Sequence, residues 1–184
     1  MHIDKTIIEQ CKKQDRKAQE QLYYKIYPYI MGICYRYFLS KEDAKDIANM
    51  SIYKILTNIQ SYDETYAFTT WISKITTNTI FEEFRKKRKL QNIQYTDEYT
   101  ENYNTSTIND YLEKLNYNEI LKIIEQLDKT EKIIFNMFFI DGYSHKEIAQ
   151  SLNISEGTSK WYLNQAKNKL KKVLSHQIIV HEEK

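Results

Sequence analysis

Residues 144–163 read SHKEIAQSLNISEGTSKWYL and decide the fold. Helical spacing of apolar residues ends at Leu152 and a new helix begins at Ser155, so only a tight corner fits between them. Asn153 stands in this corner and tolerates the left-handed backbone that a corner requires. The pattern predicts a helix-turn-helix in which Ala149 is small because the two helices cross there. The predicted shared core consists of Ile148, Leu152, Ile154, Leu163, Ala166 and Leu170.

The second helix of this motif has a polar outer face. With 159, 163, 166 and 170 turned inward, the residues predicted to face outward are Glu156, Gly157, Lys160, Trp161, Asn164 and Lys167. A helix N-terminus offers free backbone N–H groups to phosphate, and Lys and Asn side chains reach base edges in the major groove. The face is therefore predicted to bind duplex DNA. The alternative is a solvated corner in an all-helical protein, because such corners also occur as purely structural pieces.

The rest of the chain is predicted to be helical too, which makes the fold all-α. Three glycines and one proline are too few for the turns of a many-stranded sheet, and apolar residues recur at spacings of three and four. One helix carries Ala18, Leu22 and Ile26, and Pro28 is expected in the first turn of the next. SKED at 40–43 caps a further helix, SYDETY at 61–66 is a loop, and a long helix is expected from 67 to 89.

The hydrophobic period disappears over 90–110 and returns from Tyr111. This change predicts two small helical domains, 1–90 and 112–184, joined by a flexible linker at 91–111. DKTE at 128–131 and SHKE at 144–147 are expected to cap helices, and Gly142 is expected to end one in a left-handed conformation. The linker is acidic, whereas RKKRK at 85–89 and the lysines of 155–175 are basic. Two basic surfaces around a tether suggest a polyanionic partner, although solvated helix faces are the simpler explanation for any single run.

Several classes of protein are excluded. The chain has 184 residues, of which 41% are apolar, enough for a core. It has neither an apolar stretch of about 20 residues for a membrane span nor a secretion signal, so a cytoplasmic location is expected. Cys11 and Cys34 are expected to be plain helix-face residues, with no metal site. The four histidines are scattered and no carboxylate pair or phosphate-binding glycine loop is present, so we expect no enzyme, cofactor or small-molecule substrate.

Three stretches together resemble a known family. They are DAKDIANMSIYKIL at 43–56, SYDETYAFTTWISKITTNTIFEEFRKKRK at 61–89, and LDKTEKIIFNMFFIDGYSHKEIAQSLNISEGTSKWYLNQAKNKLKKVL at 127–174. Their order and character are similar to regions two and four of the extracytoplasmic-function (ECF) sigma factors of bacterial RNA polymerase. The resemblance implies that domain 1–90 binds the core polymerase and the minus-ten element, and that domain 112–184 binds the minus-thirty-five element. It also implies transcription initiation by promoter melting, without hydrolysis.

The resemblance assigns roles to individual residues. The positions expected to dock on the clamp coiled coil of the largest polymerase subunit are Asp43, Asp46 and Asn49, although Asp43 can also serve as a helix cap. The positions expected at the minus-ten element are Tyr62, Asp63, Trp71, Lys74 and Asn78, with Arg85, Lys86, Lys87 and Arg88 on backbone phosphates; core packing is the competing role for Trp71. The positions expected at the minus-thirty-five element are Ser155, Glu156, Gly157, Thr158, Lys160, Trp161, Asn164 and Lys167.

The resemblance further implies contacts with the polymerase flap and with promoter DNA, and many family members are held by an anti-sigma protein. The acidic linker can follow the path of nascent RNA or act as a mere spacer. Asn153 replaces the usual turn glycine and preserves the corner, and Thr77 replaces a frequent arginine near the minus-ten contacts. Ser159 replaces the usual valine, and Tyr162 and Gln165 replace arginines that often follow it, so the promoter sequence cannot be transferred from relatives. A helix-turn-helix regulator that acts without polymerase contact remains the alternative, and the basic run at the end of the long helix speaks against it.

Overall fold

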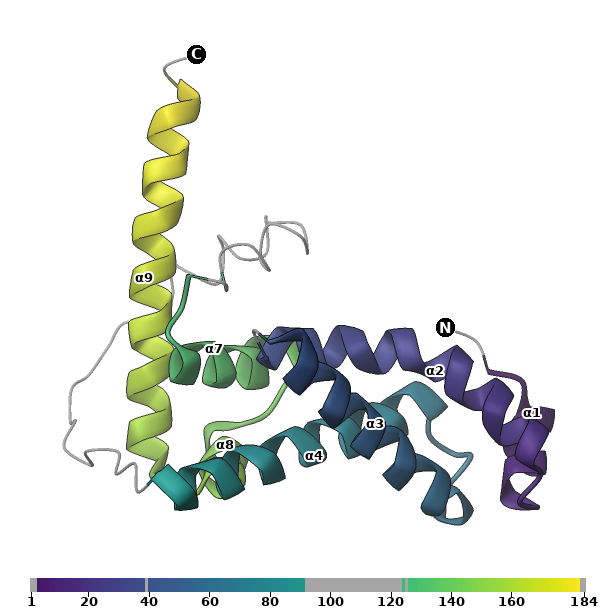
Figure 1. The fold of residues 1–184 in the computed structure, drawn as a ribbon. Coiled ribbons are helices and arrows are strands. Elements are labelled where there is room, and N and C mark those ends of the chain that lie inside the picture. Colours follow the sequence, from purple (N-terminus) through teal and green to yellow (C-terminus); the bar gives the residue numbers. More distant parts are fainter. Residues whose placement is uncertain (1–2, 39, 92–123, 125, 183–184) are drawn as a thin grey trace. The chain divides into compact units, whose positions relative to one another are not determined.

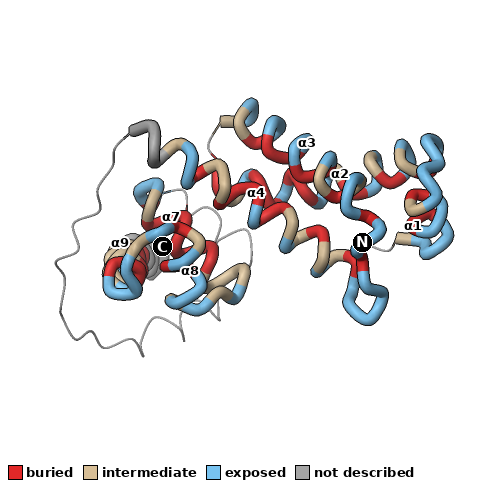
Figure 2. Tube along the Cα trace, turned by 90° about the horizontal axis from the view of Figure 1, so that it is seen from below, coloured by how far each residue is buried: buried red, intermediate tan, exposed pale blue. Residues whose placement is uncertain are grey.

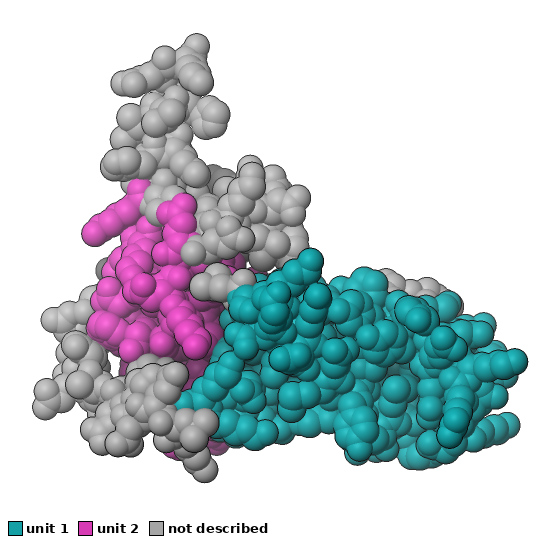
Figure 3. Space-filling model, viewed as in Figure 1, with its two compact units in different colours: residues 1–90 teal, residues 91–184 magenta. Residues whose placement is uncertain are grey.

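The computed structural model describes residues 3–38, 40–91, 124 and 126–182. All regular secondary structure in these ranges is helical, which confirms the predicted all-α class (Figure 1). The chain divides into two compact units, Met1–Leu90 and Gln91–Lys184 (Figure 3). Except for Gln91, the predicted linker lies outside the described residues, as does most of the helix predicted from Tyr111.

The described residues of unit 1 form four α-helices and one short 3₁₀ turn. They are α1 (Lys5–Lys12), α2 (Arg16–Tyr37), α3 (Lys41–Thr57), η1 (Ile59–Ser61) and α4 (Phe68–Gln91). Polar side chains accept a backbone N–H at the starts of the first three helices, where free N–H groups need a partner. These caps are Asp4, Asp15 and Ser40. The predicted loop 61–66 corresponds to the segment between η1 and α4, and the long helix predicted over 67–89 corresponds to α4.

The buried faces of α2, α3 and α4 are turned toward one another and form the core of unit 1 (Figure 2). Ile26, Ile55 and Ile72 are all fully buried, one from each helix. The ring of Tyr37 on α2 meets Phe81 on α4 edge-on at 5.9 Å. Burial of each such side chain contributes about 1.5–3 kcal/mol, so this shared core holds the surface residues of the three helices in fixed relative positions.

The prediction that a new helix begins at Pro28 is wrong, because α2 runs without a break from Arg16 to Tyr37. An internal proline removes one backbone hydrogen bond and costs about 3 kcal/mol. Leu22, Ile26 and Ile30 nevertheless form one fully buried stripe on both sides of Pro28, which itself lies on the exposed side. The burial of that stripe, at about 1.5–3 kcal/mol per side chain, outweighs the local cost.

Unit 2 contains the predicted helix-turn-helix. Its described elements are α7 (Lys129–Phe135), the π-turn η2 (Asn136–Ile140), α8 (His145–Leu152) and α9 (Glu156–Glu182). Gly142 has φ +74°, and Asn153 has φ 54° and ψ 53°, so both predicted left-handed positions are confirmed. The capping box of Ser144 and Glu147 is also present. The π-turn was not predicted.

The two cysteines pack in the core of unit 1, as expected for plain helix-face residues. Both are free, and burial raises the pKa of Cys11 to about 11 and that of Cys34 to about 12. Neither thiol is therefore a thiolate at neutral pH. Within the described part of the chain, no helix combines the length and apolar character needed to cross a bilayer. In the same residues, no group of three or more metal-ligating side chains comes together.

Candidate nucleic-acid interface

The N-terminus of α9 presents the most exposed part of the predicted duplex-binding face. Ser155 caps the helix, and its Oγ accepts the N–H of Thr158 at 2.9 Å. Glu156, Gly157 and Lys160 are exposed around this first turn. The side chain of Thr158 is buried and its Oγ1 lies 2.8 Å from Ser155 Oγ. The prediction for Thr158 is corrected accordingly, since this side chain helps to close the cap and does not lie on the surface.

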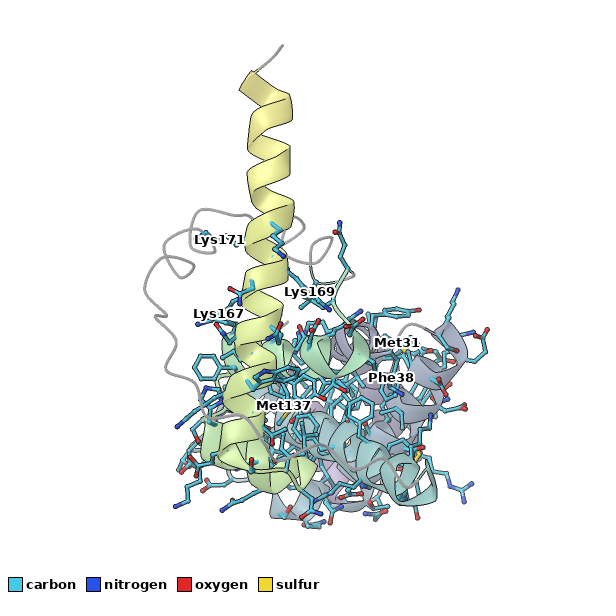
Figure 4. The ribbon with its side chains drawn as sticks, turned by 90° about the vertical axis from the view of Figure 1, so that its left-hand side faces the viewer. Met31, Phe38, Met137, Lys167, Lys169 and Lys171 are labelled. Atoms are coloured by element: carbon cyan, nitrogen blue, oxygen red, sulfur yellow. The ribbon has the colours of Figure 1, made fainter. Side chains whose placement is uncertain are left out.

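The prediction that Lys167 faces outward is wrong. Lys167 is labelled on α9 in Figure 4. Its side chain is 4% exposed, and Nζ lies 5.1 Å from the ring centroid of Phe139. Burial lowers the pKa of Lys167. Position 167 follows Leu163 by four residues and precedes Leu170 by three, so helical spacing alone places it on the inward stripe. The basic residue type had suggested a surface role that the spacing contradicts.

Two further residues of this face are half-buried. Trp161 packs edge-on against Tyr162 with 4.7 Å between ring centroids. Asn164 is partly covered, and its amide nitrogen is buried. The exposed part of the predicted duplex-binding face is therefore narrower than predicted and consists of the first turn of α9 and Lys160.

His145 joins the two helices of the motif, a contact that the sequence analysis missed. Its ring stacks on Phe138 at 4.8 Å, and Nδ1 lies 2.9 Å from Ser159 Oγ. Burial lowers the pKa of His145, and the charges of Lys160 and Lys167 lower it further. The histidine thus fixes α8 to α9 in its neutral form. Its position at the start of α8, opposite the inward Ser159, was the available signal.

The loop after η1 is a closed turn in which Tyr62 is held in the core. Its side chain is 9% exposed, and its ring lies 5.0 Å from Phe68 and 5.3 Å from Trp71. The Tyr62 hydroxyl donates to the carbonyl oxygen of Tyr66 at 2.7 Å. The structure therefore corrects the prediction that Tyr62 is presented to a base. The exposed aromatic side chain of this loop is Tyr66, which is 65% exposed.

Asp63 and three residues of α4 lie beside this loop or on the adjoining helix. The Asp63 carboxylate accepts the backbone N–H of Thr65 at 2.9 Å, and its hydrogen bonds to Thr65 lower its pKa. Lys74 and Asn78 are exposed, and Trp71 is half-buried. Because 71, 74 and 78 are spaced by three and four residues, they share one face of α4. Trp71 packs in the aromatic cluster with Tyr62 and Phe68 and keeps part of its side chain exposed, so its contact with the minus-ten element stays a prediction.

The basic end of α4 is only partly free. Arg85 and Lys86 are exposed, whereas the side chain of Arg88 lies outside the described residues. Lys87 Nζ lies 3.3 Å from Asp43 Oδ1 and 3.8 Å from a Glu83 carboxylate oxygen. One residue predicted to hold DNA phosphate thus pairs with one predicted to contact the polymerase.

The outer face of α3 carries the other two residues predicted for polymerase contact. Asp46 and Asn49 are exposed, and Asn49 Oδ1 accepts the Tyr23 hydroxyl at 3.3 Å. Met50 and Tyr53 are 39% and 70% exposed, and their spacing from Asp46 places them on the same face. These two apolar side chains were missed, although the same spacing could have found them. Exposed large apolar residues that gather on one helix face indicate an interaction surface.

Unit 2 places the protein in the class of helix-turn-helix proteins. The family model for Sigma-70 region 2 matches residues 22–90, and the family model for Sigma-70, region 4 matches residues 117–170. The ECF RNA polymerase sigma factor SigW of Bacillus subtilis (strain 168) is 28% identical over 91% of this chain and 94% of its own length. The ECF RNA polymerase sigma-E factor of Haemophilus influenzae is 25% identical over 84% and 86%. The chain belongs to the sigma-70 family, in its ECF group.

Solved structures with a similar chain include two complexes. The structure of CnrH with the cytosolic domain of CnrY matches with 17% identity and a TM-score of 0.47, over 94% of this chain and 97% of that one. The sigma factor RpoE with the anti-sigma factor NepR from Bartonella quintana matches with 17% identity and a TM-score of 0.47, over 85% and 96%. This chain thus spans nearly the full length of each.

Proposed function

We propose that this protein is a dissociable promoter-specificity subunit that directs core RNA polymerase to promoters and melts the minus-ten element. The observation that carries the proposal is the presence of regions 2 and 4, in this order, in one short chain. A regulator that acts without polymerase contact has no need for region 2. The family is not enzymatic, and the energy for melting comes from binding. The protein is proposed to act in the cytoplasm, where it meets the polymerase.

Docking on the polymerase is assigned to the outer face of α3. Asp46 and Asn49 supply polar groups, and Met50 and Tyr53 supply apolar area that a partner helix covers. An interface of this composition gains most of its affinity from the buried apolar anchors, and charge mainly sets orientation and rate. The clamp coiled coil is the partner proposed for this face, and the polymerase flap is proposed for unit 2. An anti-sigma partner stays a prediction, with no surface assigned to it.

Capture of the minus-ten element is assigned to the loop after η1 and the adjoining face of α4. Tyr66 takes the stacking role first given to Tyr62, because an exposed ring can receive a base at about 1–3 kcal/mol per stack. Flipping a base costs a few kcal/mol, which this contact partly offsets. Asp63, Lys74 and Asn78 provide polar contacts beside the ring. Arg85 and Lys86 hold phosphates in a salt-sensitive way.

Binding of the minus-thirty-five element is assigned to the first turn of α9. Glu156 and Gly157 expose the helix N-terminus, where backbone N–H groups and the helix dipole favour a phosphate. Lys160 is the exposed cation nearest this turn in the sequence. Trp161 and Asn164 offer only their uncovered edges to the groove. Thr158 and Lys167 are left out of the proposed contacts.

The decisive experiment is in vitro transcription. The purified protein is added to sigma-free core polymerase on promoter fragments from its own genome, and run-off transcripts are mapped. New start sites are expected with the wild type. Reversal of charge in Asp46→Lys should weaken core binding without lowering the melting temperature, because Asp46 is exposed. If the protein shifts duplex DNA but confers no start site on the polymerase, the regulator alternative replaces this proposal.

A further inference from the structure

Helix α1 lies before the part of the chain that matches region 2, which begins at residue 22. Its inner face is apolar, and Ile7, Ile8 and Cys11 are all buried. Asp4 caps its N-terminus by accepting the N–H of Thr6 at 2.9 Å. The helix is thus an integral part of unit 1, and its polar face is available for other contacts.

The C-terminus of α1 is tied to η1, the turn that leads into the DNA-capture loop. The carbonyl oxygen of Lys12, the last residue of α1, accepts a hydrogen bond from the Gln60 side-chain amide. Carbonyls in the last turn of a helix lack intrahelical partners, so this contact satisfies an otherwise unpaired group. Gln14 lies in the left-handed region at φ 62°. Its N–H donates to the carbonyl oxygen of Cys11 and closes the turn after α1.

The tip of the loop is held by a second contact from the same helix. The Glu64 carboxylate lies 3.4 Å from Lys5 Nζ and 3.4 Å from Lys12 Nζ. Lys12 also binds Glu9 at 2.9 Å, and this hydrogen bond raises the pKa of Lys12. The side chain of Lys12 is 20% exposed and is oriented by the carboxylates of Glu9 and Glu64, whereas the side chain of Lys5 is 82% exposed. The better-ordered contact is therefore the one between Lys12 and Glu64.

The two ends of the loop are joined by hydrogen bonds. Tyr62 donates to the carbonyl oxygen of Tyr66, Asp63 accepts the N–H of Thr65, and the N–H of Tyr66 donates to the carbonyl oxygen of Asp63 at 3.2 Å. A closed turn transmits a constraint on its tip to its neighbours. The position of Glu64 therefore sets the positions of Asp63 and Tyr66, the two residues proposed to meet DNA.

We propose that α1 is a positioning element of the minus-ten site: through Glu64 it holds loop 62–66 in the conformation that receives a flipped base. Glu64 is a positioning residue, since it acts through Asp63 and Tyr66 and does not itself contact the base. The inference rests on the proposed function, because it concerns how the same loop is prepared for single-stranded DNA. It adds a role for a helix that precedes the residues matched by region 2.

The test compares Glu64→Gln with a matched control. Glu64→Gln keeps size and polarity but removes the charge that both lysines meet. The control is Glu82→Gln, which removes the 2.6 Å ion pair between Lys54 and Glu82 elsewhere in unit 1. Hydrogen exchange of the free protein is followed over residues 59–67. Faster exchange in the loop is expected for Glu64→Gln and not for Glu82→Gln, with both melting temperatures unchanged.

The functional readout is the affinity of reconstituted holoenzyme for a single-stranded oligonucleotide that carries the non-template minus-ten sequence of a mapped promoter. Glu64→Gln is expected to lower this affinity about 2- to 10-fold, the range for one or two exposed ion pairs. Affinity for core polymerase and for minus-thirty-five duplex should not change. Glu64→Asp should bind the oligonucleotide more tightly than Glu64→Gln, because it keeps the negative charge. Adding Lys12→Gln to Glu64→Gln should lower the affinity little further.

The outcomes separate the two proposals. If wild-type holoenzyme selects no promoter, the proposed function fails, while the exchange experiment still measures the coupling of α1 to the loop. If the wild type works and Glu64→Gln retains wild-type loop exchange and oligonucleotide affinity, the positioning role is overturned. Equal effects of Glu64→Gln and Glu82→Gln also overturn it, because they would reflect a general loss of charge.

Discussion

Two tyrosines of one loop allow burial and binding to be tested separately. Tyr62 is 9% exposed and packs against Phe68 and Trp71, whereas Tyr66 is 65% exposed. Truncation of a buried aromatic side chain to alanine costs about 3–5 kcal/mol, so Tyr62→Ala should strongly destabilise unit 1. Substitution of an exposed residue usually changes stability by less than about 0.5 kcal/mol, so Tyr66→Ala should melt like the wild type.

For DNA binding, the exposed Tyr66 is expected to matter more than the buried Tyr62. Loss of one base stack is worth about 1–3 kcal/mol, so Tyr66→Ala should weaken holoenzyme binding to the single-stranded minus-ten oligonucleotide about 5- to 150-fold. Tyr62→Phe keeps the buried ring and loses only the hydroxyl bond to the Tyr66 carbonyl, so it should cost about 0.5–1.5 kcal/mol in stability. Urea unfolding of the free protein and equilibrium binding of the holoenzyme measure the two effects. The reasoning is refuted if Tyr66→Ala binds as the wild type, or if Tyr62→Ala leaves the unfolding midpoint unchanged.

Three further predictions concern unit 2. Lys160→Ala should weaken duplex binding for all sequences alike and reduce the salt slope of log K by about 0.9, whereas Lys167→Met, at a buried site, should leave binding unchanged in the same titration. Because the pKa of His145 is lowered from its usual 6.5, the unfolded chain takes up the proton first as pH falls. The free energy of unfolding should therefore be highest above about pH 7 and should fall as the pH drops through 6.5 toward the folded-state pKa of His145. Urea unfolding at several pH values should show a smaller fall for His145→Gln. Asn153→Val should cost about 1–2 kcal/mol in thermal unfolding because of the left-handed backbone, and Asn153→Gly should not.

The helix limits of the motif were predictable because the signals are local. Ser144 with Glu147 caps α8, and Asn153 ends it in the left-handed region, as the sequence analysis expected. Such caps depend on the chemistry of four or five consecutive residues, which a sequence displays directly. Order and class of the elements followed for the same reason.

Features decided by packing were not predictable in the same way. Pro28 inside α2 is tolerated because Leu22, Ile26 and Ile30 of the same helix are fully buried in the core of unit 1, and no local rule contains that balance. Which tyrosine of loop 61–66 enters the core depends on Phe68 and Trp71, which a sequence does not place in space. Lys167 differs, since the spacing contained the answer and residue type was given too much weight.

The two surfaces proposed for unit 1 share an ion pair. Asp43 on α3, predicted from the sequence to contact the polymerase, and Lys87 on α4, predicted to hold phosphate, are 3.3 Å apart, with side chains 49% and 37% exposed. An ion pair with this exposure contributes at most about 1 kcal/mol. A partner that binds either residue therefore loses at most about fivefold in affinity by breaking the pair. The pair therefore exchanges readily. A polymerase group that binds Asp43 leaves Lys87 with the 3.8 Å contact to Glu83 and the ring of Phe38 at 5.9 Å, and so makes the lysine more available to DNA.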